Sequence, residues 1–278
     1  MSFITRNIRL GKALRISSWR RIAIGTWPLV GDPSIYGMLE IDARPALAYI
    51  AKLREQSGAR ITVTHFVGRA LAEVYRQHPE INAVVRWGNL YPRPSVDVFF
   101  MVATDKKGED LSGTVVREAD KKSVLEISRE MEGSVPRIRE HGDRDFAGFK
   151  KLASFLPGIL NGPAIKIAQW IMYPINLWSP LLGIPRDAFG SVMITNIGAL
   201  GMDAAFAALV PYSRAPMVVT VGAVQDAPAV RDGQVIVMPQ LRLGITIDHR
   251  VIDGMQASHM ARTVKAIFAA PEDFFGKM

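Results

Sequence analysis

Residues 241–254, LRLGITIDHRVIDG, constrain the fold more than any other part of this sequence. From Leu241 to Asp248, apolar and polar residues alternate, which is typical of a β-strand with one buried face. After Gly254 the apolar residues follow the spacing of a helix. We therefore predict a half-buried strand that leads directly into a helix, so that the sheet is covered by a helical layer.

The remaining periodic segments place helices early in the chain and strands later. Helical spacing predicts helices over 44–56, 63–78, 121–134 and 255–268, and apolar β-branched runs predict strands over 96–103, 192–195, 217–221, 229–231 and 234–238. Asp232-Gly233 is a strong hairpin signal, and Pro136 marks the expected end of the third helix. The order differs from the regular alternation of a parallel sheet. We predict a single α/β domain over 1–278, a two-layer mixed β-sheet covered by helices.

The composition of the 278 residues excludes several classes of protein and site. Apolar residues make up 49% and charged residues 22%, so the chain can bury a large core and is not expected to be disordered. The absence of cysteine excludes disulfides, thiolate metal sites and a cysteine nucleophile. The net charge of +8 suits anionic partners, but the basic residues gather only in pairs, so we expect no nucleic-acid binding. Residues 1–17 lack the apolar run of a signal peptide, so we expect a cytoplasmic protein.

Residues 152–185 form an apolar segment in which Lys166 is the only charged residue. A membrane span needs about 20 apolar residues, but prolines interrupt this segment, and we expect them to limit any helix to short pieces. These prolines are Pro157, Pro163, Pro174 and Pro180. A large apolar surface marks a contact. Three occupants stay open: a neighbouring subunit, a membrane surface and an acyl chain.

His249 and Asp253 are the side chains of 241–254 that suit catalysis. Strand parity puts His249 on the apolar face and Asp248 on the other, so Asp248 is a poor candidate for orienting the imidazole. A histidine at the end of a buried strand face is most often a hydrogen-bonded core residue, whereas one that faces a cleft can act as a general base. Asp253 can also cap the following helix, with Gln256 completing a capping box.

The run Asp248-His249-Arg250-Val251-Ile252-Asp253-Gly254 resembles the active-site signature of dihydrolipoamide acyltransferases. Those are the core subunits of 2-oxoacid dehydrogenase complexes and belong to the chloramphenicol acetyltransferase-like family. Other segments are similar to that catalytic domain in the same order. They are Arg20 to Ala23, His78 to Ala83, Val96 to Thr104, Val116 to Ser123, Met193 to Gly198, Ala215-Pro216, Gly222 and Arg231 to Gly233. The resemblance covers about 18–145 and 187–275, and leaves an apolar helical insertion at about 146–186.

This resemblance implies the fold of that family and acyl transfer between coenzyme A and a thiol acceptor of the dihydrolipoamide kind. His249 would be the general base, and Thr195 would donate a hydrogen bond to the tetrahedral oxyanion. Asp253 would support the base indirectly, through a salt bridge with an arginine. The residues expected to support the site structurally are Arg20, Asn196 and Gly254. No metal is expected, because the five histidines lack ligand spacing.

The resemblance also implies partners. Related enzymes form homotrimers with active sites between subunits, and some build larger assemblies of trimers. We expect neither a lipoyl domain nor a peripheral-subunit-binding domain before the catalytic domain, so another chain would have to supply the lipoyl group. Two alternatives stay open: an acyltransferase for the hydroxyl or amine of a small molecule or lipid, and a trimeric scaffold whose chemistry has lapsed. A membrane contact through 152–185 would make the protein membrane-associated.

Overall fold

The computed structural model describes residues 4–16, 32–103, 111–141, 157–180, 186–210 and 213–276. In this part of the chain, the largest sheet comprises β2 (Ser34–Asp42), β5 (Val98–Ala103), β6 (Leu111–Val116), β8 (Val192–Asn196), β9 (Met217–Val221), β10 (Gln225–Arg231) and β11 (Gln234–Asp248). The strand order is β10-β11-β9-β8-β5-β6, and β2 pairs with β11. β8 runs parallel to β5 and β9, and the other neighbours are antiparallel. The sheet is therefore mixed, which confirms the prediction.

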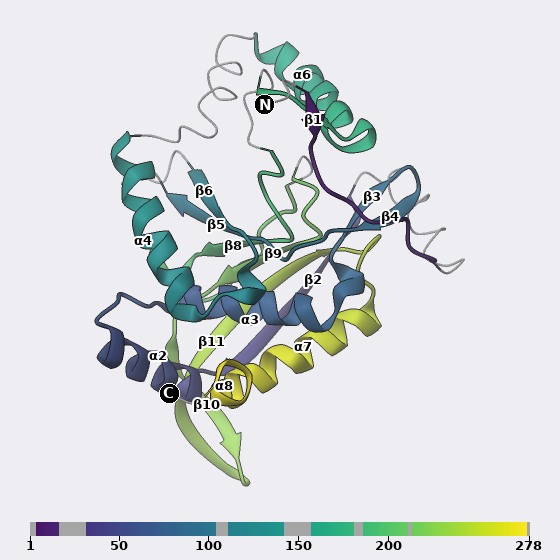
Figure 1. Ribbon diagram of the computed structural model, residues 1–278. Coiled ribbons are helices and arrows are strands. Elements are labelled where there is room, and N and C mark those ends of the chain that lie inside the picture. The colour runs from purple at the N-terminus through teal and green to yellow at the C-terminus, as the bar shows by residue number, and fades with distance from the viewer. Residues whose placement is uncertain are drawn as a thin grey trace.

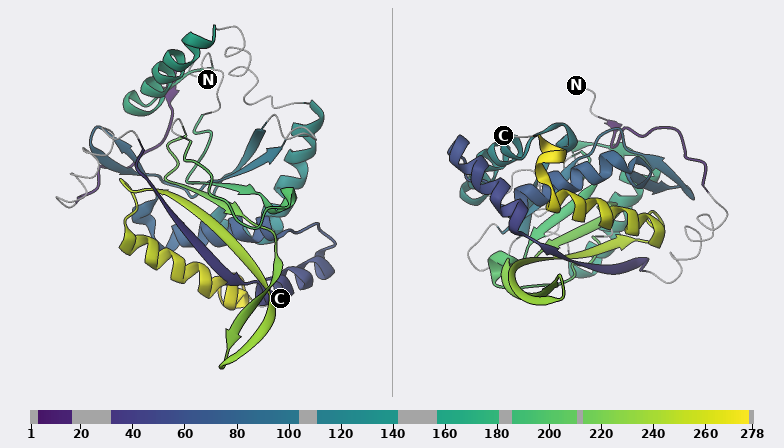
Figure 2. Two further views of the ribbon diagram at one scale, coloured as in Figure 1. Left: turned by 180° about the vertical axis from the view of Figure 1, so that it is seen from behind. Right: turned by 90° about the horizontal axis from the view of Figure 1, so that it is seen from below.

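Helices cover one face of this sheet (Figures 1 and 2). They are α2 (Arg44–Ser57), α3 (Val63–Gln77), α4 (Val124–His141), α7 (Gly254–Ala269) and α8 (Pro271–Phe275). Other short elements are the hairpin of β3 (Ala83–Arg86) and β4 (Asn89–Pro92) and the 3-10 turns η1 (Pro79–Ile81), η2 (Ala119–Lys121) and η5 (Gly198–Leu200). One helical layer on a mixed sheet is the predicted two-layer arrangement.

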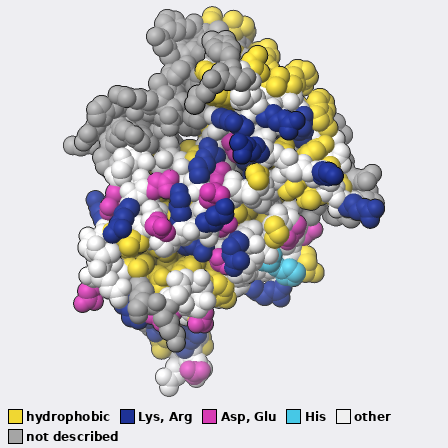
Figure 3. Space-filling model, in the orientation of Figure 1, with side chains coloured by type: hydrophobic (Ala, Val, Ile, Leu, Met, Phe, Trp, Pro, Cys, Tyr) yellow, Lys and Arg dark blue, Asp and Glu magenta, His cyan; other side chains and the backbone are white. Residues whose placement is uncertain are grey.

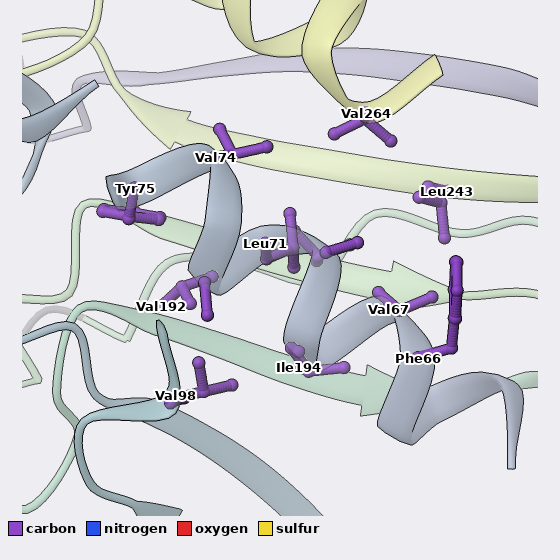
Figure 4. Packing of buried hydrophobic residues seen from close by; sticks show 14 of the residues in the cluster. Phe66, Val67, Leu71, Val74, Tyr75, Val98, Val192, Ile194, Leu243 and Val264 are labelled. Atoms are coloured by element: carbon purple, nitrogen blue, oxygen red, sulfur yellow. The ribbon is translucent and has the colours of Figure 1, made fainter. Parts of the chain in front are cut away.

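α3 lies in the middle of the helical layer, and its apolar face packs on the sheet. The buried side chains of this contact include Phe66, Val67, Leu71, Val74 and Tyr75 on α3 and Val98, Val192, Ile194 and Leu243 on the strands (Figure 4). Thr62 caps the helix: its Oγ1 accepts the N–H of His65 at 3.4 Å, and Nδ1 of His65 accepts the N–H of Thr62 at 3.2 Å. A Cβ on Gly68 would strike the ring of Phe100, so the close approach of α3 to β5 requires glycine.

The structure differs from the predictions at several boundaries and adds β2 and β6 as strands that were not predicted. Two of the differences involve prolines. α4 continues through Pro136, because a proline takes the helical φ and removes only one hydrogen bond. The buried side chains of Ile127 and Met131 hold the preceding turns in place. The strands predicted before and after Pro239 form one strand, β11. Pro239 lies where the partner of β11 changes from β10 to β2, near Gln240, and proline is tolerated where a strand's pairing ends.

The insertion, as far as the structure describes it, contains α6 (Gly158–Trp170), the wide π-helical turn η3 (Ile171–Ile175) and β7 (Leu177–Trp178). α6 passes through Pro163 and η3 contains Pro174, so the prediction of short, proline-limited pieces is wrong here. The helix is exposed, and water can bond the carbonyl groups that the prolines leave unpaired. Among the described residues, no helix combines the length and the apolar character needed to cross a bilayer.

The N-terminal segment lies beside the insertion, because β1 (Thr5–Arg6) pairs with β7 (Figure 1). Asn176 secures this contact: its Oδ1 accepts the N–H of Ile8 at 2.8 Å, and its Nδ2 donates to the Ile8 carbonyl at 2.9 Å. A second buried core lies behind it, on the sheet face opposite the helices. This core includes Ile8, Phe99, Met172, Tyr173, Phe189, Met193 and Val218.

Candidate functional site

His249 follows β11 in a tight turn just before α7. Its N–H donates to the carbonyl of Pro33 at 3.0 Å, and the amides of Val251 and Ile252 donate to the carbonyl of Asp248 at 2.9 and 3.0 Å. The imidazole is half-buried, and its Nδ1 lies 3.0 Å from the carbonyl oxygen of Ile252. A carbonyl oxygen only accepts, so Nδ1 carries the proton in this contact. The basic lone pair of the neutral ring then belongs to Nε2.

Asp248 forms an ion pair with Arg250, the residue on the other side of His249. Nη2 of Arg250 lies 2.6 Å from Oδ2 of Asp248, and Nε lies 2.9 Å from Oδ1. The backbone N–H of Arg250 donates to the same Oδ1 at 2.9 Å. The two side chains are largely buried, with the carboxylate 10% exposed. Arg250, not the imidazole, engages this carboxylate, which confirms that Asp248 does not orient His249.

Asp253 caps α7 with a complete capping box. Its Oδ1 accepts the N–H of Gln256 at 2.9 Å, and Oε1 of Gln256 accepts the N–H of Asp253 at 3.0 Å. The cap fixes the start of α7 and hence the end of the turn that holds His249. Gly254, the next residue, is exposed, and a Cβ there would meet nothing within 4 Å.

Thr195 and Asn196 end β8. Thr195 is half-buried and stands opposite Thr220 of β9. Nδ2 of Asn196 donates to Oγ1 of Thr64 at 2.8 Å, and its Oδ1 accepts the N–H of Ala199 at 3.0 Å. Asn196 therefore ties the end of this strand both to α3 and to the turn that follows.

The sheet register separates Thr195 from His249 within one chain. Thr195 stands opposite Thr220, and Thr220 stands opposite Gly244. His249 lies five positions beyond Gly244, about 16 Å along the strand at 3.3 Å per residue. This direction leads away from the C-terminal end of β8, and two strand spacings of about 4.8 Å add to the distance. The structure thus places the two predicted catalytic residues at opposite ends of the sheet.

The remaining sequence-based expectation for the site concerns a part of the chain that the structure does not describe. Arg20, the predicted partner of Asp253, lies outside the described residues, as does the basic segment 20–23 to which it belongs. The supporting role of Arg20 stays a prediction.

A cavity beside the turn of His249 was not indicated by any sequence pattern. It holds about 450 Å³ and is lined on one side by Asp248 and Arg250. Arg214, which precedes β9, and Gln169 of α6 contribute to its wall. Neither stands in a recognisable motif, because the wall joins side chains that are far apart in sequence.

Comparisons with known proteins place these features in context. The family model described as "2-oxoacid dehydrogenases acyltransferase (catalytic domain)" matches residues 31–144 and 188–276. The acetyltransferase component of the acetoin cleaving system of Bacillus subtilis is 24% identical over 217 residues, 78% of this chain and 44% of that protein. The acetyltransferase component of the pyruvate dehydrogenase complex of the same organism is 24% identical over 245 residues, 86% of this chain and 46% of that protein. The chain spans about half the length of these curated relatives.

Solved structures show the same fold. The cubic core of a pyruvate dehydrogenase multienzyme complex aligns with a TM-score of 0.65 at 18% identity, covering 95% of this chain and 94% of that one. A probable dihydrolipoamide acetyltransferase from Listeria monocytogenes aligns with a TM-score of 0.64 at 17% identity, covering 93% and 94%. A chloramphenicol acetyltransferase aligns with a TM-score of 0.53 at 14% identity, covering 95% and 99%. The predicted fold family is therefore confirmed.

Proposed function

The chain belongs to the 2-oxoacid dehydrogenase acyltransferase family through its catalytic domain, and on this premise we propose that it transfers an acyl group between coenzyme A and a thiol acceptor of the dihydrolipoamide kind. The observation that carries the proposal is the contact between His249 and Ile252. This contact orients the imidazole and leaves the basic lone pair of the neutral ring on Nε2, as a general base requires.

The reaction needs a base, because a thiol with a pKa of about 8.5 is mostly protonated at neutral pH. In the proposed step, Nε2 of His249 takes the thiol proton while the acceptor sulfur bonds to the thioester carbonyl carbon. The tetrahedral intermediate then expels the sulfur of coenzyme A, which receives the proton from the imidazolium. A hydrogen bond to the oxyanion of this intermediate is worth about 2.7–4 kcal/mol, and Thr195 is the donor that we propose.

The separation of Thr195 from His249 supports an active site shared between subunits. Because about 16 Å of strand lies between them, the two residues of one chain cannot act on one thioester carbonyl. We propose a homotrimer, alone or within a larger assembly of trimers, in which His249 of one subunit faces Thr195 of the next. Asp253 acts indirectly by fixing the turn of His249, with Arg20 as its proposed partner.

Mixing two inactive variants tests this arrangement. His249→Ala and Thr195→Ala are unfolded together and refolded as mixed trimers, and each is also refolded alone. If the site combines residues of two subunits, a random 1:1 mixture regains about a quarter of the parent activity, because one interface in four keeps both side chains. No recovery in mixtures shown to contain both chains would contradict the shared site.

The acceptor is the second part of the proposal. We propose that a lipoyl group reaches the site on another chain. The test is a transfer assay with acetyl and succinyl thioesters of coenzyme A against dihydrolipoamide, alcohols and amines. Transfer to dihydrolipoamide supports the thiol acceptor. Transfer to alcohols or amines alone would contradict the thiol acceptor and favour a hydroxyl or amine acceptor. Binding of coenzyme A without turnover on any acceptor would favour the lapsed scaffold.

For location, we propose a cytoplasmic protein that binds the surface of an anionic membrane through α6. This helix exposes large apolar side chains: Ile159 is 85% exposed, Ile167 62% and Trp170 55%. Segments 4–16 and 157–180 contain no acidic residue, and their charges are all basic: Arg6, Arg9, Lys12, Arg15 and Lys166. Figure 3 shows the hydrophobic side chains over α6 with basic side chains next to them. Apolar side chains beside basic ones suit an anionic bilayer surface.

Sedimentation with lipid vesicles tests the membrane contact. We expect binding to vesicles of phosphatidylcholine with phosphatidylserine and weak binding to phosphatidylcholine alone. Ile159→Ser with Ile167→Ser should abolish the binding. The matched control changes Val230 and Val235 to serine on the β10–β11 hairpin, where they are 71% and 74% exposed, and should leave it unchanged. If the parent does not bind vesicles and the Ile159→Ser, Ile167→Ser variant loses its oligomeric state, α6 forms a subunit contact instead.

A further inference from the structure

Arg214 is a guanidinium that lacks a counterion in the described part of the chain. It lines the 450 Å³ cavity beside the turn of His249. Its Nε–H is buried and has no hydrogen-bond acceptor among the described residues. Burial lowers the pKa of Arg214, as does the like charge of Arg250, while Tyr173 and Asp248 raise it only through space. Arg214 is half-buried, and a cation that is largely withdrawn from water is normally paired, so this arrangement indicates a missing anion.

The other charged groups of the cavity are already engaged. Asp248 is held by Arg250, with contacts of 2.6 and 2.9 Å. Asp32 accepts the backbone N–H of Ser34 at 2.9 Å. Neither carboxylate forms a hydrogen bond with Arg214 in the described part of the chain. The cavity therefore contains one positive group without a direct partner.

The backbone conformation at Arg214 also indicates a functional site. Its φ is +55°, in the left-handed region that residues other than glycine and asparagine rarely adopt. Ser213, directly before it, is buried, and its carbonyl accepts the hydroxyl of Tyr173 at 3.0 Å. The ring of Tyr173 also lies 5.8 Å from the guanidinium carbon of Arg214. Strained backbone that is held in place this firmly is typical of functional sites.

The insertion contributes Gln169 to the lining of this cavity and Tyr173 to the surroundings of Arg214. Tyr173 comes from η3 and Gln169 from α6, both within the stretch 145–187 that the family model leaves unmatched. The amide of Gln169 adds a hydrogen-bond donor to the lining of the cavity. Leu209, Val210 and Ala215 provide apolar wall between the polar groups. A small molecule with an anionic end and a short apolar stem fits this lining.

We propose that this cavity binds an oxyanion, a carboxylate or a phosphate, carried by a substrate of the neighbouring His249 site, with Arg214 as the principal contact and Gln169 as a second donor. Delivery of the oxyanion by a substrate rests on the proposed acyl transfer, whereas oxyanion binding itself does not. The two sources of such a group are the free carboxylate of a dicarboxylic acyl chain and a phosphate of coenzyme A.

Calorimetry in the His249→Ala background tests binding apart from turnover. The titrants are succinate, inorganic phosphate and coenzyme A. We expect Arg214→Met to raise the Kd of the bound oxyanion at least about tenfold and Arg214→Lys to raise it less. The control is Arg129→Gln at an exposed position of α4, which should leave the Kd unchanged. If coenzyme A displaces bound phosphate, the cavity binds a phosphate of coenzyme A. If succinate stays bound when coenzyme A is added, the cavity binds the carboxylate of the acyl chain. Binding of neither anion to the parent, or equal binding to Arg214→Met, overturns the proposal.

Two further measurements keep the proposal testable if Arg214→Met folds poorly. Gln169→Leu, which removes the second proposed donor, should raise the same Kd about threefold or more. Without anion, the Tm of Arg214→Met should equal or exceed that of the parent, because the change removes an unpaired, partly buried charge. A lower Tm together with an unchanged anion-induced rise in Tm would make Arg214 a structural residue and overturn the proposal.

Discussion

Nδ1 of His249 lies 3.0 Å from the carbonyl oxygen of Ile252, three residues further along the same turn. The imidazole is therefore oriented by its own backbone, while the adjacent carboxylate of Asp248 is taken by Arg250. A base held in this way depends on the turn, and the turn depends on the helix cap at Asp253. The turn, the cap at Asp253 with Gln256, and the contact of the His249 N–H with Pro33 thus place the proposed base.

His249→Ala should lower acyl transfer by about 10²–10⁴-fold, the usual contribution of a general base. The change removes the ring but none of the backbone hydrogen bonds of the turn, so fold and oligomeric state should persist. Turnover is measured with acetyl-coenzyme A and dihydrolipoamide. His259→Ala, an exposed histidine on α7, is the control and should keep full activity. Undiminished turnover in His249→Ala would remove this residue from the mechanism.

Thr195→Ala should lower turnover by about 10²–10³-fold if its hydroxyl stabilises the oxyanion. Thr195→Ser keeps a hydroxyl and should retain most of the activity. Thr114→Ala on β6 is a matched control, because that threonine is also half-buried in the same sheet. A loss in Thr195→Ala below about threefold, far short of that range, would make Thr195 a strand residue without a catalytic role.

Coenzyme A should bind more weakly as salt is added, because screening reduces the attraction between its phosphates and the basic residues of the protein. Calorimetry at low and high sodium chloride measures the effect. Pantetheine, which has the same thiol arm without phosphates, is the control ligand and should show little dependence on salt. An equal salt response of the two ligands would show that phosphate contacts do not contribute.

His65 should make the free energy of unfolding depend on pH below neutrality. Burial, followed by the nearby Arg54 and Arg60 and opposed by Glu132, lowers the pKa of His65 to about 4. The unfolded chain takes up this proton near pH 6.5, so stability is full above pH 6.5 and falls as the pH drops from 6.5 through 4. The expected loss is about 3 kcal/mol.

Chemical denaturation at several pH values, for the parent and for His65→Gln, measures this dependence. Glutamine at this position can keep the capping box with Thr62 but does not titrate. The difference between the two proteins isolates His65, because the other histidines titrate in both. The same pH slope in both proteins would contradict the assignment.

Gly244→Ala should destabilise the fold by about 1–3 kcal/mol, the usual effect of overpacking. A Cβ at Gly244 would strike the carbonyl oxygen of Ala205, a backbone atom that cannot turn away, and would lie 2.5 Å from Oγ1 of Thr220. Gly37→Ala on the neighbouring strand β2 is the control, since a Cβ there meets nothing within 4 Å. Thermal unfolding compares the two, and equal Tm values would contradict the prediction.

Most of the sheet and helices could be predicted because their patterns are local. Alternation in 241–248, the Asp232-Gly233 turn and the capping box at Asp253 each involve only neighbouring residues. The failures at Pro136 and Pro163 have one cause. A proline removes a single hydrogen bond, and whether a helix continues depends on packing and solvent around it, which lie outside the local pattern.

The candidate site, too, could be predicted from the sequence only in part. His249, Thr195 and their neighbours are visible in the sequence because the family resemblance marks them, but their separation in one chain follows from the strand register. The cavity at Arg214 joins residues from the insertion, β11 and the segment before β9. A pattern along the chain cannot indicate such a grouping, because only the fold brings its members together.

The pairing of β1 with β7 has a consequence for the order in which the molecule is built. Ile8 and Asn176, which hold the N-terminal segment to the insertion, are separated by 168 positions. During synthesis Ile8 therefore emerges long before its partner Asn176, and the closing of so large a loop is slow. Until then Ile8 cannot cover Met172 and Tyr173. Apolar surface that stays exposed in this way during synthesis is prone to aggregation.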